Sequence, residues 1–177
     1  MAPSNTIEFS YTADNKTVAQ YTTHVSELTD PNLITACTFW TSMPYETILA
    51  IIAALPNLEF IRCEYNNLTK FELPYSPKIK HIQLSNNNIA EFDASNTPNL
   101  THLLLGYNPL RSLKSLAKLK DLKSLVLSCT DVSSLVNLPV SLEYLDVHKC
   151  HSLGYVDVSY LPKMKHVRGN DVDVDTC

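Results

Sequence analysis

The sequence predicts an α/β fold, a solenoid in which short parallel strands stack along one face of a coil. One stretch, from Leu100 to Leu113, has the pattern L-x-x-L-x-L-x-x-N-x-L-x-x-L. Further copies begin 21, 21, 22, 20 and 22 residues apart, at Leu58, Ile79, Leu100, Leu122, Leu142 and Met164. Within each copy the L-x-L alternation is that of a strand, whose successive side chains point to opposite faces. A fixed period of this length indicates a repeat architecture.

We number the repeat positions from the first apolar residue of each copy. Positions one, four and six are expected inside the coil, because one turn alone cannot bury its apolar residues and needs its neighbours. Each fully buried side chain contributes about 1.5–3 kcal/mol. At position nine, Asn66, Asn87 and Asn108 are also expected inside, bonded to backbone groups of adjacent turns, since an unpaired buried amide costs about 1–3 kcal/mol.

This pattern resembles the leucine-rich repeat over roughly three quarters of the chain. The phrase F-D-A-S-N-T-P-N-L at residues 92–100 and V-D-V-S at 156–159 further resemble the bacterial repeats of internalin-type and Bacteroides-type surface proteins. The resemblance implies a right-handed horseshoe with a parallel concave β-sheet and a convex side of short helices, 3₁₀ turns and loops. It also implies protein recognition, with host or cell-surface proteins as the partner class.

Residues 1–30 do not follow the repeat. A β-hairpin is predicted by three features: alternation from Thr6 to Tyr11, turn residues at 13–15 and a β-favouring stretch from Thr17 to Tyr21. An open solenoid needs a cap over its exposed core, so residues 1–30 are interpreted as the N-terminal cap. Residues 31–177 then form the repeat domain of about seven units, the first and last of them degenerate.

The first unit is predicted to begin at Leu33, because Pro31-Asn32-Leu33 repeats the phrase that begins the copies at Leu58 and Leu100. This register places Ala36 and Thr38 inside. The unit is longer than the others, and its extra residues 44–55, bounded by prolines, predict a helix on the convex side. Later units are expected to carry 3₁₀ turns or extended loops, with a short helical turn within residues 112–119.

Composition narrows the function classes. A net charge of −4 gives no general attraction to phosphate backbones, so nucleic acid is not an expected partner. The longest apolar run, residues 48–55, is too short for membrane insertion. No signal peptide is visible at Met1, so localisation stays open: secreted or cell-surface if the natural chain begins upstream, cytoplasmic otherwise. No catalytic or cofactor motif occurs, and we expect neither an enzyme nor a cofactor.

No metal site is expected either. His148, Cys150 and His151 have the composition of a zinc cluster, but the register points His148 outward and Cys150 inward. His81 and His102 share position three on adjacent strands, which predicts rings about 5 Å apart. Stacking is favoured there over adventitious zinc.

The outward positions three, five, seven and eight of the strands are rich in aromatic and apolar residues, where a solvated face would be polar. Tyr, Trp and Arg dominate the energetics of protein interfaces. We therefore predict non-catalytic binding of an unidentified protein partner on this face, with glycan binding through the aromatic rings as the alternative and weak homodimerisation as a further expectation. An alternative for Phe39, Trp40 and Phe60 is packing beneath the cap. The predicted partner-binding residues are Trp40, Phe60, Arg62, Tyr65, His81, His102, Leu104, Tyr107, Val126, Tyr144, His148 and Arg168.

Overall fold

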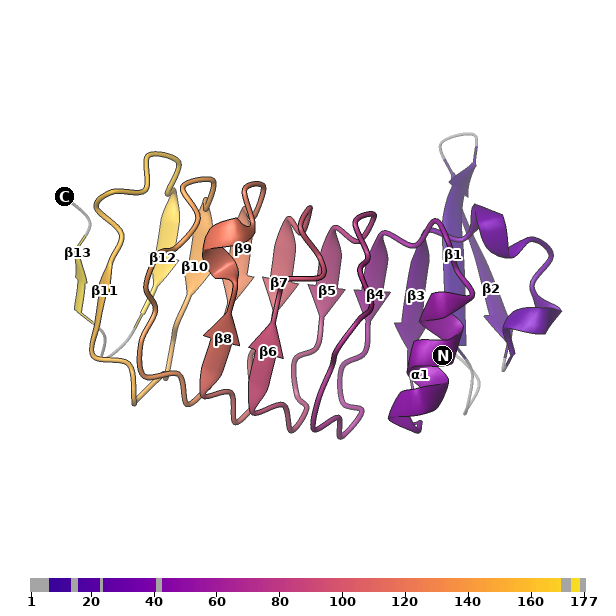
Figure 1. Cartoon of the computed structure of the whole chain (residues 1–177), viewed down its shortest axis with the longest axis horizontal. Helices are drawn as coiled ribbons and strands as arrows, with labels where there is room; N and C mark the ends of the chain where they lie inside the picture. The colour runs from indigo at the N-terminus through magenta and orange to yellow at the C-terminus, as the bar shows by residue number, and fades with distance from the viewer. Residues whose placement is uncertain (1–6, 14–15, 23, 41–42, 170–172, 176–177) are drawn as a thin grey trace.

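Successive turns of the chain place their strands side by side in one long sheet. The structure is a computed structural model, and it describes residues 7–13, 16–22, 24–40, 43–169 and 173–175. Among these residues the main sheet has nine strands in the order β12-β10-β9-β7-β5-β4-β3-β1-β2 (Figure 1). Its parallel strands are β3 (Ala36–Phe39), β4 (Phe60–Arg62), β5 (His81–Gln83), β7 (His102–Leu104), β9 (Ser124–Val126), β10 (Tyr144–Asp146) and β12 (His166–Arg168). The predicted repeat solenoid with a parallel sheet is confirmed; its handedness and horseshoe curvature stay predictions.

An antiparallel hairpin extends this sheet at its N-terminal end. It consists of β1 (Ile7–Ala13) and β2 (Lys16–Thr22), and β1 also pairs antiparallel with β3. Two short 3₁₀ helices, η1 (Val25–Glu27) and η2 (Pro31–Leu33), connect the hairpin to β3. The division of the chain into a cap at 1–30 and a repeat domain from 31 stays a prediction, and residues 170–172 and 176–177 of that domain lie outside the described residues.

The predicted register of the first unit is wrong by one residue. Leu33 is exposed, and Ile34, Cys37 and Phe39 are buried where Leu33, Ala36 and Thr38 were expected inside. The pairing of β1 with β3 sets Ile7 opposite Phe39 and Phe9 opposite Cys37, and all four side chains are buried. A shift of one residue turns every side chain of a strand to the other face. The hairpin therefore decides the register, and Pro31-Asn32-Leu33 forms η2 instead of starting the repeat.

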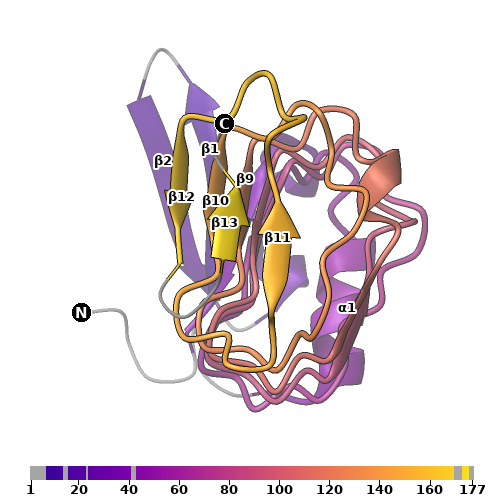
Figure 2. The ribbon, with the colours of Figure 1, turned by 90° about the vertical axis from the view of Figure 1, so that its left-hand side faces the viewer.

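Short elements lie across the core from the main sheet. The predicted helix is present as α1 (Tyr45–Ala53), on the side opposite the sheet (Figure 2). Beyond it the chain forms two small parallel sheets, which pair β6 (Glu91–Asp93) with β8 (Ser112–Lys114), and β11 (Tyr155–Asp157) with β13 (Asp173–Asp175). Residues 112–119, expected to be a helical turn, divide into β8 and the 3₁₀ helix η3 (Leu116–Lys118). The small sheets were not predicted, because the sequence analysis expected only 3₁₀ turns or extended loops on this side of the coil.

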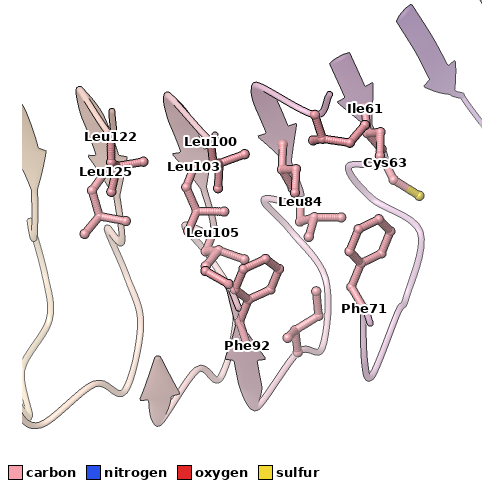
Figure 3. Close-up of a cluster of buried hydrophobic side chains, with 14 of the residues drawn as sticks. Ile61, Cys63, Phe71, Leu84, Phe92, Leu100, Leu103, Leu105, Leu122 and Leu125 are labelled. Carbon is pink, nitrogen blue, oxygen red and sulfur yellow. The ribbon is translucent and has the colours of Figure 1, made fainter. Parts of the chain in front are cut away.

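Aliphatic side chains fill the space between the two walls of the coil (Figure 3). Leu103 and Leu125 at position four, and Leu84 and Leu105 at position six, have no exposed surface. Phe92 of β6 reaches the same core from the opposite wall. The residues predicted at these positions from the second to the sixth unit are confirmed as core, because each turn is covered by the turns on both sides. In the last unit Met164 and Val167 are only half-buried.

Asparagines at position nine tie consecutive turns together. The Oδ1 atom of Asn87 accepts the backbone N–H groups of Asn66 and Leu68, both at 3.0 Å. Its Nδ2 donates to the carbonyls of Cys63 and Leu84, at 2.8 and 2.9 Å. The amide therefore satisfies buried backbone groups in its own turn and in the preceding one. This confirms the predicted structural role.

Asn108 repeats these bonds one turn later, with Ile89 N–H at 2.9 Å and Leu84 and Leu105 carbonyls at 3.0 and 2.9 Å. The ladder weakens after that point. Thr130 donates only to its own turn, to Leu127 O at 2.7 Å, and the thiol of Cys150 donates to the same carbonyl at 3.0 Å. The turns from 58 to 110 are thus joined by more side-chain bonds than the later ones.

Substitution of Asn87 by Ala is expected to lower the free energy of unfolding by about 3 kcal/mol, because buried backbone groups in two turns lose their partner. Urea unfolding followed by circular dichroism measures the change. Asn88→Ala is the matched control: Asn88 is the next residue and its side chain is exposed, so its loss is expected to cost less than about 0.5 kcal/mol. Equal losses of unfolding free energy in the two variants would contradict the stabilising role of the Asn87 bonds.

Candidate functional site

The outward side of the parallel strands forms one continuous surface, which we call the exposed sheet face. It consists of positions three, five, seven and eight of successive turns. Parallel pairing brings equal positions together: Tyr144 lies beside Ser124 and His166, and Leu104 lies beside Gln83 and Val126. The residues predicted from the sequence all lie on this face: Trp40, Phe60, Arg62, Tyr65, His81, His102, Leu104, Tyr107, Val126, Tyr144, His148 and Arg168.

Position three forms a row of rings on β4, β5 and β7. Phe60 and His81 have ring centroids 5.9 Å apart with planes tilted by 48°, and His81 and His102 are stacked at 4.2 Å with an angle of 18°. The predicted stacking of the two histidines is confirmed. Thr101 Oγ1 lies 2.9 Å from Nδ1 of His102, which helps to orient that ring.

The stacked pair favours uncharged imidazoles. Burial against the neighbouring strands lowers the pKa of His81, and the charges of His102 and Lys80 lower it further, while Glu59 raises it. Burial also lowers the pKa of His102, with an added contribution from Lys123 that Glu143 opposes. Two protonated rings at stacking distance repel each other, so near neutral pH this part of the face is neutral and partly apolar.

Position five is polar or charged toward both ends of the sheet, from Arg62 to Arg168, and apolar in the middle. Leu104 and Val126 are half-buried although they point away from the core. In the next turn Asp146 is only 5% exposed. Its Oδ2 forms an ion pair with Arg168 Nη1 at 3.6 Å, and its Oδ1 accepts the backbone N–H of His148 at 3.0 Å. The C-terminal half of the face is therefore polar and the middle is apolar.

Trp40 joins the hairpin to the exposed sheet face. Its Nε1 donates to Glu8 Oε2 at 3.2 Å, and the Arg62 guanidinium lies 5.4 Å from its ring centroid. Arg62 is held in turn by Glu64 at 2.7 Å. Phe39 is buried in the core opposite Ile7 of β1, as the packing alternative expected, whereas Trp40 remains 47% exposed. Its ring is thus fixed in place and still accessible.

Position eight has the same unusual backbone in every full turn. The φ angles of Tyr65, Asn86, Tyr107, Cys129 and Lys149 lie between 56° and 59°. This left-handed region suits glycine or asparagine and is uncommon for bulky residues. Tyr65 and Tyr107 nevertheless occupy it, with 71% and 58% of their surface exposed. Their rings stand in solvent at a backbone position that tyrosine disfavours.

Sequence reasoning missed two residues of the site. Lys149 occupies position eight and is exposed. The repeat count placed it on the outward side, but it was not included among the predicted partner-binding residues. Glu8 could not be found this way, because its bond to Trp40 depends on how the hairpin pairs with β3.

The described residues contain no cluster of three or more His, Cys, Asp or Glu side chains able to hold a metal ion. Cys150 points inward and bonds to Leu127 O, away from His148 on the exposed sheet face. Burial raises the pKa of the Cys63 thiol to about 12 and that of Cys37 well above its usual range. Neither thiol is therefore activated as a nucleophile or ligand.

Within the described residues, none of the helices has the length and apolar character needed to cross a membrane.

Comparisons with known proteins give a distant structural similarity. No protein-family profile and no curated protein matches the sequence. Among solved structures, the chain is similar to the functional domain of InlJ from Listeria monocytogenes, described as including a cysteine ladder. The TM-score is 0.32 and the identity 14%, over 68% of this chain and 41% of that one. The chain thus spans less than half of the InlJ chain, and its own residues carry the functional argument.

Substitution of Tyr65 by Gly is expected to raise the free energy of unfolding by about 0.5–1 kcal/mol, since glycine relieves the left-handed backbone and little packing is lost. Chemical denaturation of the intact chain measures it. Tyr144→Gly, within strand β10, is expected to lower the free energy of unfolding by about 1 kcal/mol or more. A loss of stability in both variants would contradict the strain at position eight.

Stability is also expected to fall as the pH drops from neutral. The pKa values of His81 and His102 are lowered in the folded chain, so the unfolded chain binds more protons below about pH 6.5. The decline starts near that pH and levels off below the folded pKa values. Urea unfolding between pH 7.5 and 5 measures it. Replacing both histidines by Asn should flatten the dependence, and an unchanged slope would contradict the assignment.

Proposed function

We propose that the chain is a non-catalytic protein-binding module whose ligand lies on the exposed sheet face. The observation that carries this proposal is the pair Tyr65 and Tyr107, both largely exposed on left-handed backbone. Residues kept in a disfavoured conformation without a packing role are candidates for function. Tyrosine supplies a large contact area with few rotatable bonds, which makes it a common anchor in protein interfaces.

The surroundings of the two tyrosines support the same role. Trp40 lies at one end, held by Glu8 and Arg62, and the half-buried Leu104 and Val126 form the middle. Ladders of backbone bonds run beneath all of them, so the surface is formed before a partner arrives. A preformed apolar centre with a polar border is the usual anatomy of a protein interface.

Replacing Tyr65 and Tyr107 together by Asn is expected to abolish capture of the protein partner while the fold is kept, because Asn86 already occupies this backbone position. Affinity capture with the intact chain, followed by mass spectrometry and quantified for each captured protein, measures the effect. Tyr75→Ser is the matched control, since Tyr75 is 68% exposed but lies in a loop outside the exposed sheet face.

Proteins retained by the control and lost by the double variant support the proposal. Equal capture by both variants contradicts it. Retention on a glycan array that depends on Tyr65 and Tyr107, with no protein lost, would favour the glycan alternative instead.

A further inference from the structure

The residues of position eight form a row along the coil with a regular step. Backbone bonds between turns continue through this row: the N–H of Asn86 donates to Gly106 O at 3.0 Å, and that of Tyr107 donates to Ser128 O at 2.8 Å. Cys129 N–H continues the row one turn later. Chains joined in this way lie about 4.8 Å apart, so two turns span about 9.6 Å.

The large side chains of this row recur at every second turn. Tyr65, Tyr107 and Lys149 are separated by two turns each, and the shorter Asn86 and Cys129 stand between them. All five have a φ angle between 56° and 59°, so their Cα–Cβ bonds start from equivalent backbone positions on successive turns. The row thus carries exposed long side chains on backbone positions about 9.6 Å apart. Shorter side chains lie between them, and the Tyr107 hydroxyl is hydrogen-bonded to the thiol of Cys129.

This step matches one polypeptide conformation. A polyproline II helix has three residues per turn and rises about 3.1 Å per residue, so its side chains repeat every 9.3 Å or so. An extended strand repeats after about 6.7 Å and an α-helix after about 5.4 Å. Only the polyproline II repeat stays in phase with Tyr65, Tyr107 and Lys149 along the coil.

The chemistry of the row fits the same ligand. Aromatic side chains are the usual partners of proline rings in polyproline II recognition. Backbone carbonyls of such a segment have no internal hydrogen bonds and need donors. The amide of Asn86, between the two tyrosines, is such a donor. Lys149 is exposed and makes no ion pair within the described part of the chain, so its charge is available to an acidic side chain.

We infer that the ligand of the exposed sheet face is a proline-rich segment in the polyproline II conformation, lying along the coil axis. Two prolines three residues apart pack against Tyr65 and Tyr107, and an acidic residue three positions further pairs with Lys149. This inference rests on the proposed function and specifies its partner.

Fluorescence anisotropy with the intact chain and short labelled synthetic peptides tests the inference. The in-phase peptide carries Pro, Pro and Asp three residues apart, in either chain direction. The out-of-phase peptide has the same composition with a spacing of two. We expect the in-phase peptide to bind about tenfold more tightly or better, because only its side chains meet all three positions at once.

Protein variants check each contact separately. Tyr65→Asn with Tyr107→Asn is expected to weaken binding of the in-phase peptide by about tenfold or more, and Tyr75→Ser to leave it unchanged. Lys149→Asn is expected to remove the preference for Asp over Lys at the third peptide position, with the proline contacts kept. Circular dichroism of each variant establishes that the fold is intact.

The outcomes separate this inference from the proposed function. Protein capture that depends on Tyr65 and Tyr107, together with no peptide binding or equal binding of both peptide spacings, would exclude the proline-rich ligand. The proposal of a protein-binding exposed sheet face would then remain supported. If neither capture nor peptide binding responds to those two residues, both proposals are overturned.

Discussion

The structure depends on the burial of aliphatic side chains between consecutive turns. Leu84, Leu105 and Leu127 lie on successive turns and have no exposed surface, since each is covered from both sides. No turn could bury these residues alone, so every turn is stable only within the stack. The outer side of the strands takes no part in this burial, and it is consequently free to carry side chains chosen for another purpose.

Turn geometry links the core to the surface. The asparagine amides at position nine bond to backbone groups of two turns. The residue before them has the same left-handed φ in the turns of Thr130 and Cys150, which have no asparagine at position nine. The left-handed residue is therefore a feature of the turn itself, and this turn carries Tyr65 and Tyr107 at the end of each strand. Backbone bonds position the strands of the exposed sheet face, and contacts between side chains orient some of its rings, as in the row of Phe60, His81 and His102.

Much of this arrangement could be predicted from the sequence because the repeat has a single period. Counting positions from Leu58 onward identified the core, the position-nine asparagines and the stacked pair His81 and His102. The first turn could not be predicted in this way, since the antiparallel pairing of the hairpin with β3 overrides the local Pro-Asn-Leu phrase. For the same reason the contact between Glu8 and Trp40 could not be predicted, because it joins residues 32 positions apart that follow no common pattern. The strained backbone of position eight leaves no trace in composition.

The two ends of the sheet differ in how they are fastened, and this gives the molecule a mechanical polarity. At the N-terminal end β1 pairs with β2 over seven residues and with β3 over four, while at the other end β12 pairs with β10 over three. Under a stretching force we therefore expect turns to detach first from the C-terminal side. The hairpin acts as an anchor during this unzipping, and the turns that carry Tyr65 and Tyr107 are among the last to open.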